Sequence, residues 1–145
     1  MRDRNLLRDD GNAAVEFALL LPILVLLVAG LIDFGRAYFT RMELENAARA
    51  GAQYGILHGT DNLATIQDIV RQASDVPTAD LTVSASTFCA CPDGTVQDCT
   101  TGDCGGFKPG TYVSISAQTA FVPIFPFANS SRPATITGTA LVRTE

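Results

Sequence analysis

The most prominent feature in the pattern of apolar and polar residues is one long apolar run close to the N-terminus. Residues 13–32 carry a single charged side chain, Glu16. At 1.5 Å per residue a helix over this run is about 30 Å long, which matches the hydrocarbon core of a bilayer. We therefore predict a transmembrane helix over residues 12–32.

Helical character continues beyond this run. Residues 33–57 contain no proline and are rich in Ala, Leu, Met, Glu and Arg, which favour helices. Small residues recur every three or four positions, so that another backbone can approach closely. We expect this face to pack on a helix of another subunit or on the chain's own sheet. The small residues are Ala47, Ala48, Gly51, Ala52 and Gly55.

Gly59 is expected to end the long helix. Thr60 or Asp61 then caps a second helix that ends near Ser74. Three later segments alternate apolar with hydroxyl side chains, which predicts antiparallel strands with one covered face. The predicted class is α+β: a long N-terminal transmembrane helix extends out of the membrane and packs on a small antiparallel sheet with one further helix. The strand segments are residues 81–86, 113–121 and 136–142.

The segment Pro123–Phe127 is apolar, but its two prolines exclude an interior strand. Two interpretations remain open for it. If the segment is exposed, it is a docking surface, because large exposed apolar patches mark interaction sites. Otherwise it is a lid over the edge of the sheet.

Glu16 requires an explanation, because an ionisable side chain within a membrane costs a few kcal/mol on insertion scales. Gly11 lies five residues before it. A cut after Gly11 would free the α-amino group of Asn12 about one helical turn from Glu16, and the amine and carboxylate could neutralise each other. The alternative is a glutamate that merely extends to the headgroups and has no role.

A short charged leader, Gly11 and a glutamate at the fifth position after it together resemble the N-terminus of type IV prepilins. The longer segment AAVEFALLLPILVLLVAGLIDFGRAYFTRMELENAARAGAQYG resembles TadE-like proteins, which are minor pilins or pseudopilins of tight-adherence pili. In that family Glu-Phe, Leu-Pro, Phe-Gly-Arg-Ala and Asn-Ala-Ala-Arg-x-Gly-Ala segments recur in this order. The resemblance covers residues 11–55 and, more loosely, the ending ATITGTALVRTE.

This resemblance implies a prepilin-type leader at residues 1–11, cut by a prepilin peptidase between Gly11 and Asn12. It implies that Glu16 neutralises the new terminus and aligns subunits, and that residues 33–145 form an extracytoplasmic pilin-like domain. The implied function is assembly of a tight-adherence pilus or related secretion filament. The implied partners are membrane lipid, the peptidase, other pilin or pseudopilin subunits and the assembly platform. The leader departs from the family pattern, since it balances three Arg with three Asp.

The flanking charges do not determine the orientation of the helix, because three Arg lie shortly before the apolar run and three after it. The leader and the cysteines favour a cytoplasmic N-terminus. We therefore expect a single-pass protein of the cytoplasmic (inner) membrane, with an extracytoplasmic C-terminal domain and incorporation into a pilus. A removed signal peptide is disfavoured, because the run is too long and lacks a small-x-small site. The other alternative is an unprocessed, membrane-anchored extracytoplasmic binding module.

The four cysteines, Cys89, Cys91, Cys99 and Cys104, all lie within a single loop, residues 89–104. In an oxidising compartment they predict two disulfides, for which three connectivities are open. A zinc site is a weaker alternative, because the spacing lacks paired C-x2-C motifs. A catalytic thiol is weaker still.

Charge and composition exclude several other functions. The net charge is −5, and seven basic against twelve acidic residues follow Gly11, so nucleic acid is not an expected partner. His58 is the only histidine, and no nucleophile elbow or phosphate-binding loop is present. Three aspartates of the cysteine loop do not follow the calcium-loop pattern. We expect no enzyme activity, no cofactor and no metal.

Overall fold

A computed structural model describes residues 6–125 and 134–144, with side chains from residue 12 onward. It confirms the predicted α+β class: a long apolar N-terminal helix packs on a four-stranded antiparallel sheet, accompanied by one short helix. The chain divides into two compact units. The first contains residues 1–36 and 123–130, and the second contains residues 37–122 and 131–145. The elements are α1 (Leu6–His58), α2 (Leu63–Gln72), β1 (Leu81–Ala90), β2 (Val96–Gln97), β3 (Gly110–Phe121) and β4 (Ala134–Arg143).

Helix α1 begins at Leu6, six residues before the predicted start, and continues through Pro22. It ends at His58, and Gly59 follows with a φ of +80°. The predicted glycine stop is therefore confirmed, because glycine adopts this left-handed conformation without a steric penalty. The N-terminal part is long and apolar enough to cross a membrane, with a mean hydropathy of 2.7. A signal sequence near the N-terminus would share this property.

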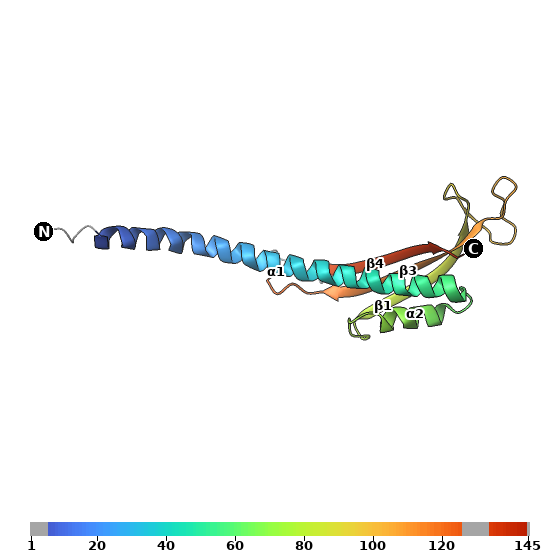
Figure 1. Cartoon of the computed structure of the whole chain (residues 1–145), viewed down its shortest axis with the longest axis horizontal. Helices are drawn as coiled ribbons and strands as arrows, with labels where there is room; N and C mark the ends of the chain where they lie inside the picture. The colour runs from blue at the N-terminus through green and yellow to red at the C-terminus, as the bar shows by residue number, and fades with distance from the viewer. Residues whose placement is uncertain (1–5, 126–133, 145) are drawn as a thin grey trace. The chain divides into compact units, whose positions relative to one another are not determined.

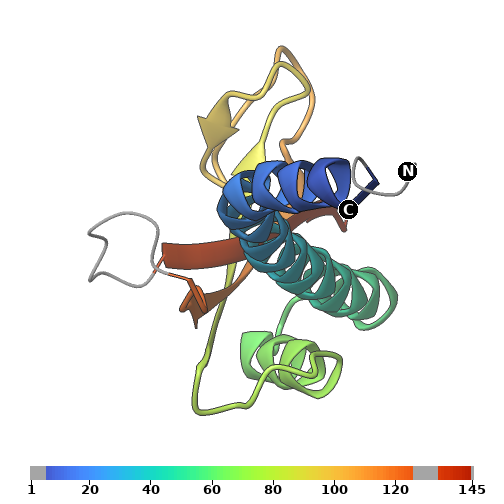
Figure 2. The same cartoon turned by 90° about the vertical axis from the view of Figure 1, so that its left-hand side faces the viewer.

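The second half of α1 packs on the chain's own sheet and on α2, which confirms one of the two interpretations of its small residues. Leu44 is fully buried. At Gly51 an added Cβ would overlap Val70 of α2 and would lie 3.3 Å from Ile115 Cδ1 of β3. Figures 1 and 2 both show residues 37–58 of α1 beside α2. Glycine at position 51 is therefore what allows the two helices to approach each other.

Helix α2 presents Ile66 and Val70 to the core, and both are fully buried. Its N-cap is Asn62, whose side-chain oxygen accepts a hydrogen bond from Thr65 N at 3.2 Å. The prediction that Thr60 or Asp61 caps this helix was therefore wrong. Asn62 directly precedes the first helical residue, which is the position from which a side chain reaches the exposed N–H groups.

The sheet has the strand order β2-β1-β3-β4, and all neighbours are antiparallel. The three predicted strands are confirmed, with their alternating apolar residues turned toward the core. Strand β2 was not predicted, because two residues are too few to show an alternating pattern. The buried core consists of Leu44, Ala47, Ala48, Ala52, Ile66, Val70, Leu81, Val83, Val113, Ile115 and Ala117.

Candidate functional site

The first candidate site is the predicted cleavage position between Gly11 and Asn12, which lies within α1. Asn12 and Glu16 are four residues apart and therefore share one face of the helix. Asn12 Nδ2 donates to Glu16 Oε1 at 3.5 Å, and both side chains are exposed. The Glu16 carboxylate thus already reaches the residue that would carry the new amino group after a cut at Gly11.

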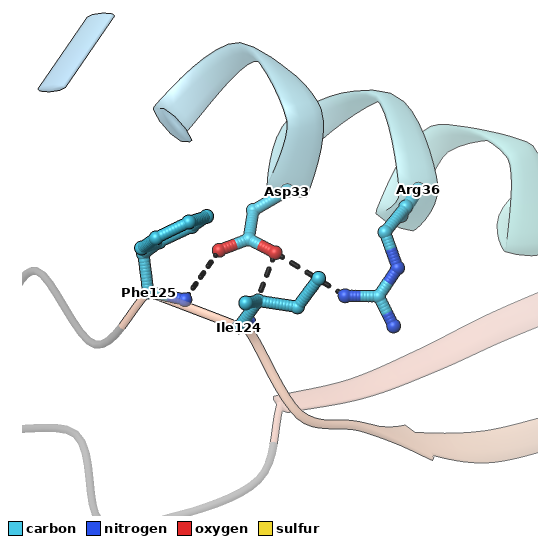
Figure 3. Close-up of polar contacts among 4 residues, drawn as sticks. All are labelled: Asp33, Arg36, Ile124 and Phe125. Atoms are coloured by element: carbon cyan, nitrogen blue, oxygen red, sulfur yellow. Dashed lines mark hydrogen bonds and ion pairs between the residues drawn. The ribbon is translucent and has the colours of Figure 1, made fainter. Parts of the chain in front are cut away.

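A second polar site lies at Asp33, the first residue after the apolar run. Asp33 Oδ1 accepts a hydrogen bond from Ile124 N at 3.0 Å, and Oδ2 accepts one from Phe125 N at 2.9 Å. The Arg36 guanidinium lies 3.3 Å from Oδ1 on the other side (Figure 3). The Ile124 N–H, then the Phe125 N–H and Arg36, lower the pKa of Asp33, because all three favour its charged form.

Sequence reasoning missed Asp33. The available signal was an aspartate directly after an apolar run, together with a later Pro-bounded segment whose N–H groups cannot join a sheet. Nothing in the local pattern joins these two features, because the hydrogen-bonded residues are 91 and 92 positions apart. The site becomes visible only in the folded chain.

Phe125 packs against the apolar part of α1. Together they enclose a shallow hollow of about 230 Å³, lined by Leu24, Val25, Val28, Ala29, Ile32 and Phe125. The segment Pro123–Phe127 is described as far as Phe125, and Pro126 and Phe127 lie outside the described residues. The sequence analysis offered two interpretations of this segment, a docking surface and a lid over the edge of the sheet. Neither interpretation predicted that Phe125 would contact α1.

The cysteines of residues 89–104 form two pairs at disulfide distance, and Cys89 itself lies at the end of β1 and not in a loop. Cys89 lies with Cys99, and Cys91 lies with Cys104, with Cα–Cα separations of 5.1 and 5.5 Å. The structure therefore selects one of the three connectivities that the sequence left open. The loop lies at the end of the sheet where the C-terminus also lies (Figure 1), and Thr144 N donates there to Thr111 O.

The aspartates of this loop close tight turns. Asp93 accepts a hydrogen bond from Thr95 N at 2.9 Å, and Asp98 Oδ1 accepts one from Thr100 N at 2.8 Å. Asp98 Oδ1 also accepts from the Thr100 hydroxyl and from Thr101 N. These groups, the Thr100 hydroxyl first, hold the pKa of Asp98 far below its usual range. Backbone N–H donation from Thr95 is the main cause that lowers the pKa of Asp93.

The described part of the chain contains no group of three or more His, Cys, Asp or Glu side chains arranged to hold a metal ion. His58 stacks on Tyr54, with ring centroids 4.3 Å apart. Its Nδ1 lies 3.3 Å from the Tyr54 carbonyl oxygen. These contacts suit a residue that finishes a helix.

Asp98→Ala is expected to open the turn at Thr100 and Thr101, because one carboxylate oxygen accepts both of their backbone N–H groups. Hydrogen–deuterium exchange of these two amides should become several-fold faster, and Asp98→Asn, which keeps an acceptor oxygen but loses the charge, should lie between the alanine variant and the unsubstituted protein. Equal exchange in the alanine variant would show that the disulfides alone hold the turn.

The same turn should weaken in acid. The pKa of Asp98 is lowered in the folded chain, so its stabilising effect is present above the ordinary aspartate pKa of about 3.9. The effect is lost as the pH falls below that value and through the lowered folded pKa. Exchange measured at descending pH, corrected for intrinsic rates, should show this loss in the unsubstituted protein and not in Asp98→Asn.

Comparison with known families bears on the N-terminal part of the chain. Residues 11–53 form a TadE-like domain, since they match the TadE-like protein family, and the match lies within α1. No curated protein and no solved structure is significantly similar to the chain. The resemblance predicted for residues 11–55 is confirmed over residues 11–53. Such a domain implies a Tad pilus-associated protein of the cell envelope, from a pilin-like structural family and not an enzyme family. The long apolar helix is consistent with a membrane anchor or a signal sequence.

Proposed function

From the TadE-like domain at residues 11–53, we propose that the chain is a minor pilin or pseudopilin that takes part in assembling a tight-adherence pilus or related filament. A prepilin peptidase removes residues 1–11, and residues 12–32 then anchor the protein in the cytoplasmic membrane. Residues 33–145 form the extracytoplasmic domain, in which the paired cysteines are oxidised. The partners are other pilin subunits and the assembly platform.

The observation that best supports this proposal is the contact between Asn12 and Glu16. A lone carboxylate within a membrane helix needs a partner, because the hydrocarbon offers none. Helical geometry places Glu16 within hydrogen-bonding distance of residue 12. Once the peptidase cuts after Gly11, the new α-amino group of Asn12 lies on the same turn. The amine and carboxylate then form a compensated pair, within one subunit or between neighbours.

The position of the cut is the first test of this function. The chain should have Asn12 as its N-terminal residue in cells that contain the prepilin peptidase, and Met1 in cells that lack it. N-terminal sequencing together with intact mass measures both, and a peptidase-negative strain complemented with the peptidase gene is the control. Met1 in both strains would instead support an unprocessed, anchored binding module.

A further inference from the structure

The segment Pro123–Phe125 follows β3 without continuing the sheet, and its Ile124 and Phe125 side chains are exposed. Ile124 is 57% exposed and Phe125 is 40% exposed. From Asn12 to Arg36, only Ala29 and Asp33 are buried in the part of the chain that the structure describes. Both lie on the face of α1 that carries this segment. The segment therefore covers part of the helix and still presents apolar side chains outward.

The depth of this contact along α1 can be read from the helical rise. Phe125 lines a hollow with residues that lie between Leu24 and Ile32. At 1.5 Å per residue, Val28 lies about 6 Å before Ile32, the last residue of the apolar run. A side chain that reaches Val28 is thus within the 5–10 Å depth at which interfacial segments insert.

The backbone of the segment is suited to a low-dielectric surrounding. A buried N–H group without an acceptor costs several kcal/mol in hydrocarbon, so irregular backbone is rarely exposed to lipid. Pro123 has no N–H. Asp33 accepts hydrogen bonds from the N–H groups of Ile124 and Phe125 (Figure 3). All three residues are therefore free of unsatisfied backbone donors.

The charged side chains of Asp33 and Arg36, just beyond the apolar run, are paired with each other. The Arg36 guanidinium lies 3.3 Å from the Asp33 carboxylate, and the Arg36 side chain is about half exposed. A long arginine side chain at the end of an apolar run can extend its charged group toward the headgroups. The apolar surface is continuous with the run, since Leu24, Val25 and Val28 line the hollow beside Phe125 and are all exposed.

We propose that residues Pro123–Phe125 form a second membrane contact, which inserts Ile124 and Phe125 into the acyl-chain side of the headgroup region next to α1, with Asp33 as the residue that holds the segment there. The occupant of this surface is phospholipid. The inference rests on the proposed membrane anchoring of residues 12–32, and it adds a second point of attachment on the extracytoplasmic side.

The chain contains no tryptophan, so one introduced tryptophan reports its own surroundings. The full chain is reconstituted into vesicles of phosphatidylethanolamine and phosphatidylglycerol that carry brominated lipids, which quench tryptophan on contact. Phe125→Trp should be quenched, and more strongly by lipids brominated near the glycerol end than near the methyl end. Phe17→Trp, within the apolar run, is the positive control, and Phe107→Trp in the cysteine loop is the control that should not be quenched.

The three variants separate failure of this inference from failure of the anchor. If Phe17→Trp is quenched and Phe125→Trp is not, the anchor stands and the inserted segment is wrong. A blue-shifted, unquenched Phe125→Trp whose emission depends on protein concentration would assign the surface to another protein subunit and would also overturn the inference. If Phe17→Trp itself is unquenched, residues 12–32 are not in the membrane and both proposals fail.

The role of Asp33 has a matched control. Asp33 and Asp68 each pair with an arginine three residues later on a helix, but only Asp33 also accepts the two backbone N–H groups. In the Phe125→Trp background, Asp33→Ala should reduce quenching at position 125 several-fold. Asp68→Ala should leave it unchanged. Equal quenching in both variants would show that Asp33 does not hold the segment.

Discussion

Glu16→Ala is expected to be cut normally after Gly11 and to be lost from filaments. In the proposed function the cut occurs at Gly11, five residues away, whereas assembly requires the new amino group of Asn12 to be neutralised within an apolar surrounding. A charged group at the centre of a membrane helix costs about 2.5–3.5 kcal/mol on insertion scales, and Asn12 and Glu16 lie nearer its N-terminal end. The full cost corresponds to roughly a hundredfold change in an equilibrium, which is an upper limit for this position. Recovery of the variant with sheared filaments should fall by about tenfold or more, while its level in the membrane fraction is maintained.

Asn12→Ala is the matched control for this prediction. It removes the side-chain amide that now donates to Glu16, but it leaves the α-amino group that the cut would create. This variant should be cut and incorporated normally. Glu16→Gln, which keeps the shape of the side chain and removes its charge, should behave like Glu16→Ala. Normal incorporation of the uncharged Glu16 variants would contradict the charge-compensation role.

Gly138→Ala is expected to destabilise the unit that contains the sheet more than any other glycine substitution in β3 or β4. Gly138 lies on β4 opposite α1, and a Cβ added there would overlap the backbone nitrogen of Glu45 and the carbonyl carbon of Leu44. It would also lie 2.7 Å from Leu44 Cβ. Backbone atoms of a packed helix cannot move away singly, so the helix would have to separate from the sheet. Overpacking of this kind costs about 1–3 kcal/mol or more.

Gly110→Ala is the matched control, because it adds the same methyl group to a neighbouring strand. There the new Cβ would meet the Arg143 side chain, 2.6 Å from Nε, which can rotate away. Thermal unfolding of the full chain in detergent, followed by near-ultraviolet circular dichroism, measures both variants. The midpoint should fall by roughly 10–20 °C for Gly138→Ala, given about 4–8 °C per kcal/mol. Equal midpoints for the two variants would show that α1 is not held against β4 at this point.

Much of the fold could be predicted because its signals are local. The alternation of apolar and hydroxyl residues in β1, β3 and β4 identifies both the strands and their buried faces. The small residues of α1 predicted a close approach, and Gly51 shows that it is made to α2 and β3. Strand β2 and the Asn62 cap were missed, since each depends on only one or two residues.

Candidate sites that depend on local spacing could likewise be predicted, whereas those that depend on distant contacts could not. Gly11, Asn12 and Glu16 could be identified from spacing, because one helical turn places residues four apart on one face. The pairing of the cysteines could not be identified, because three connectivities satisfy the same spacing. Asp33 could not be identified either, since its partners Ile124 and Phe125 are 91 and 92 residues away.

The sequence by itself determined the apolar helix, its end before Gly59, the three main strands and the position of Glu16 one turn from Asn12. Each of these is a matter of periodicity or short spacing. Only the tertiary structure decided which cysteines meet, which strand touches the backbone of α1 at Gly138 and what the Asp33 carboxylate binds. The physical reason is that these contacts form between segments far apart in sequence. Short-range patterns carry no information on which distant segments meet.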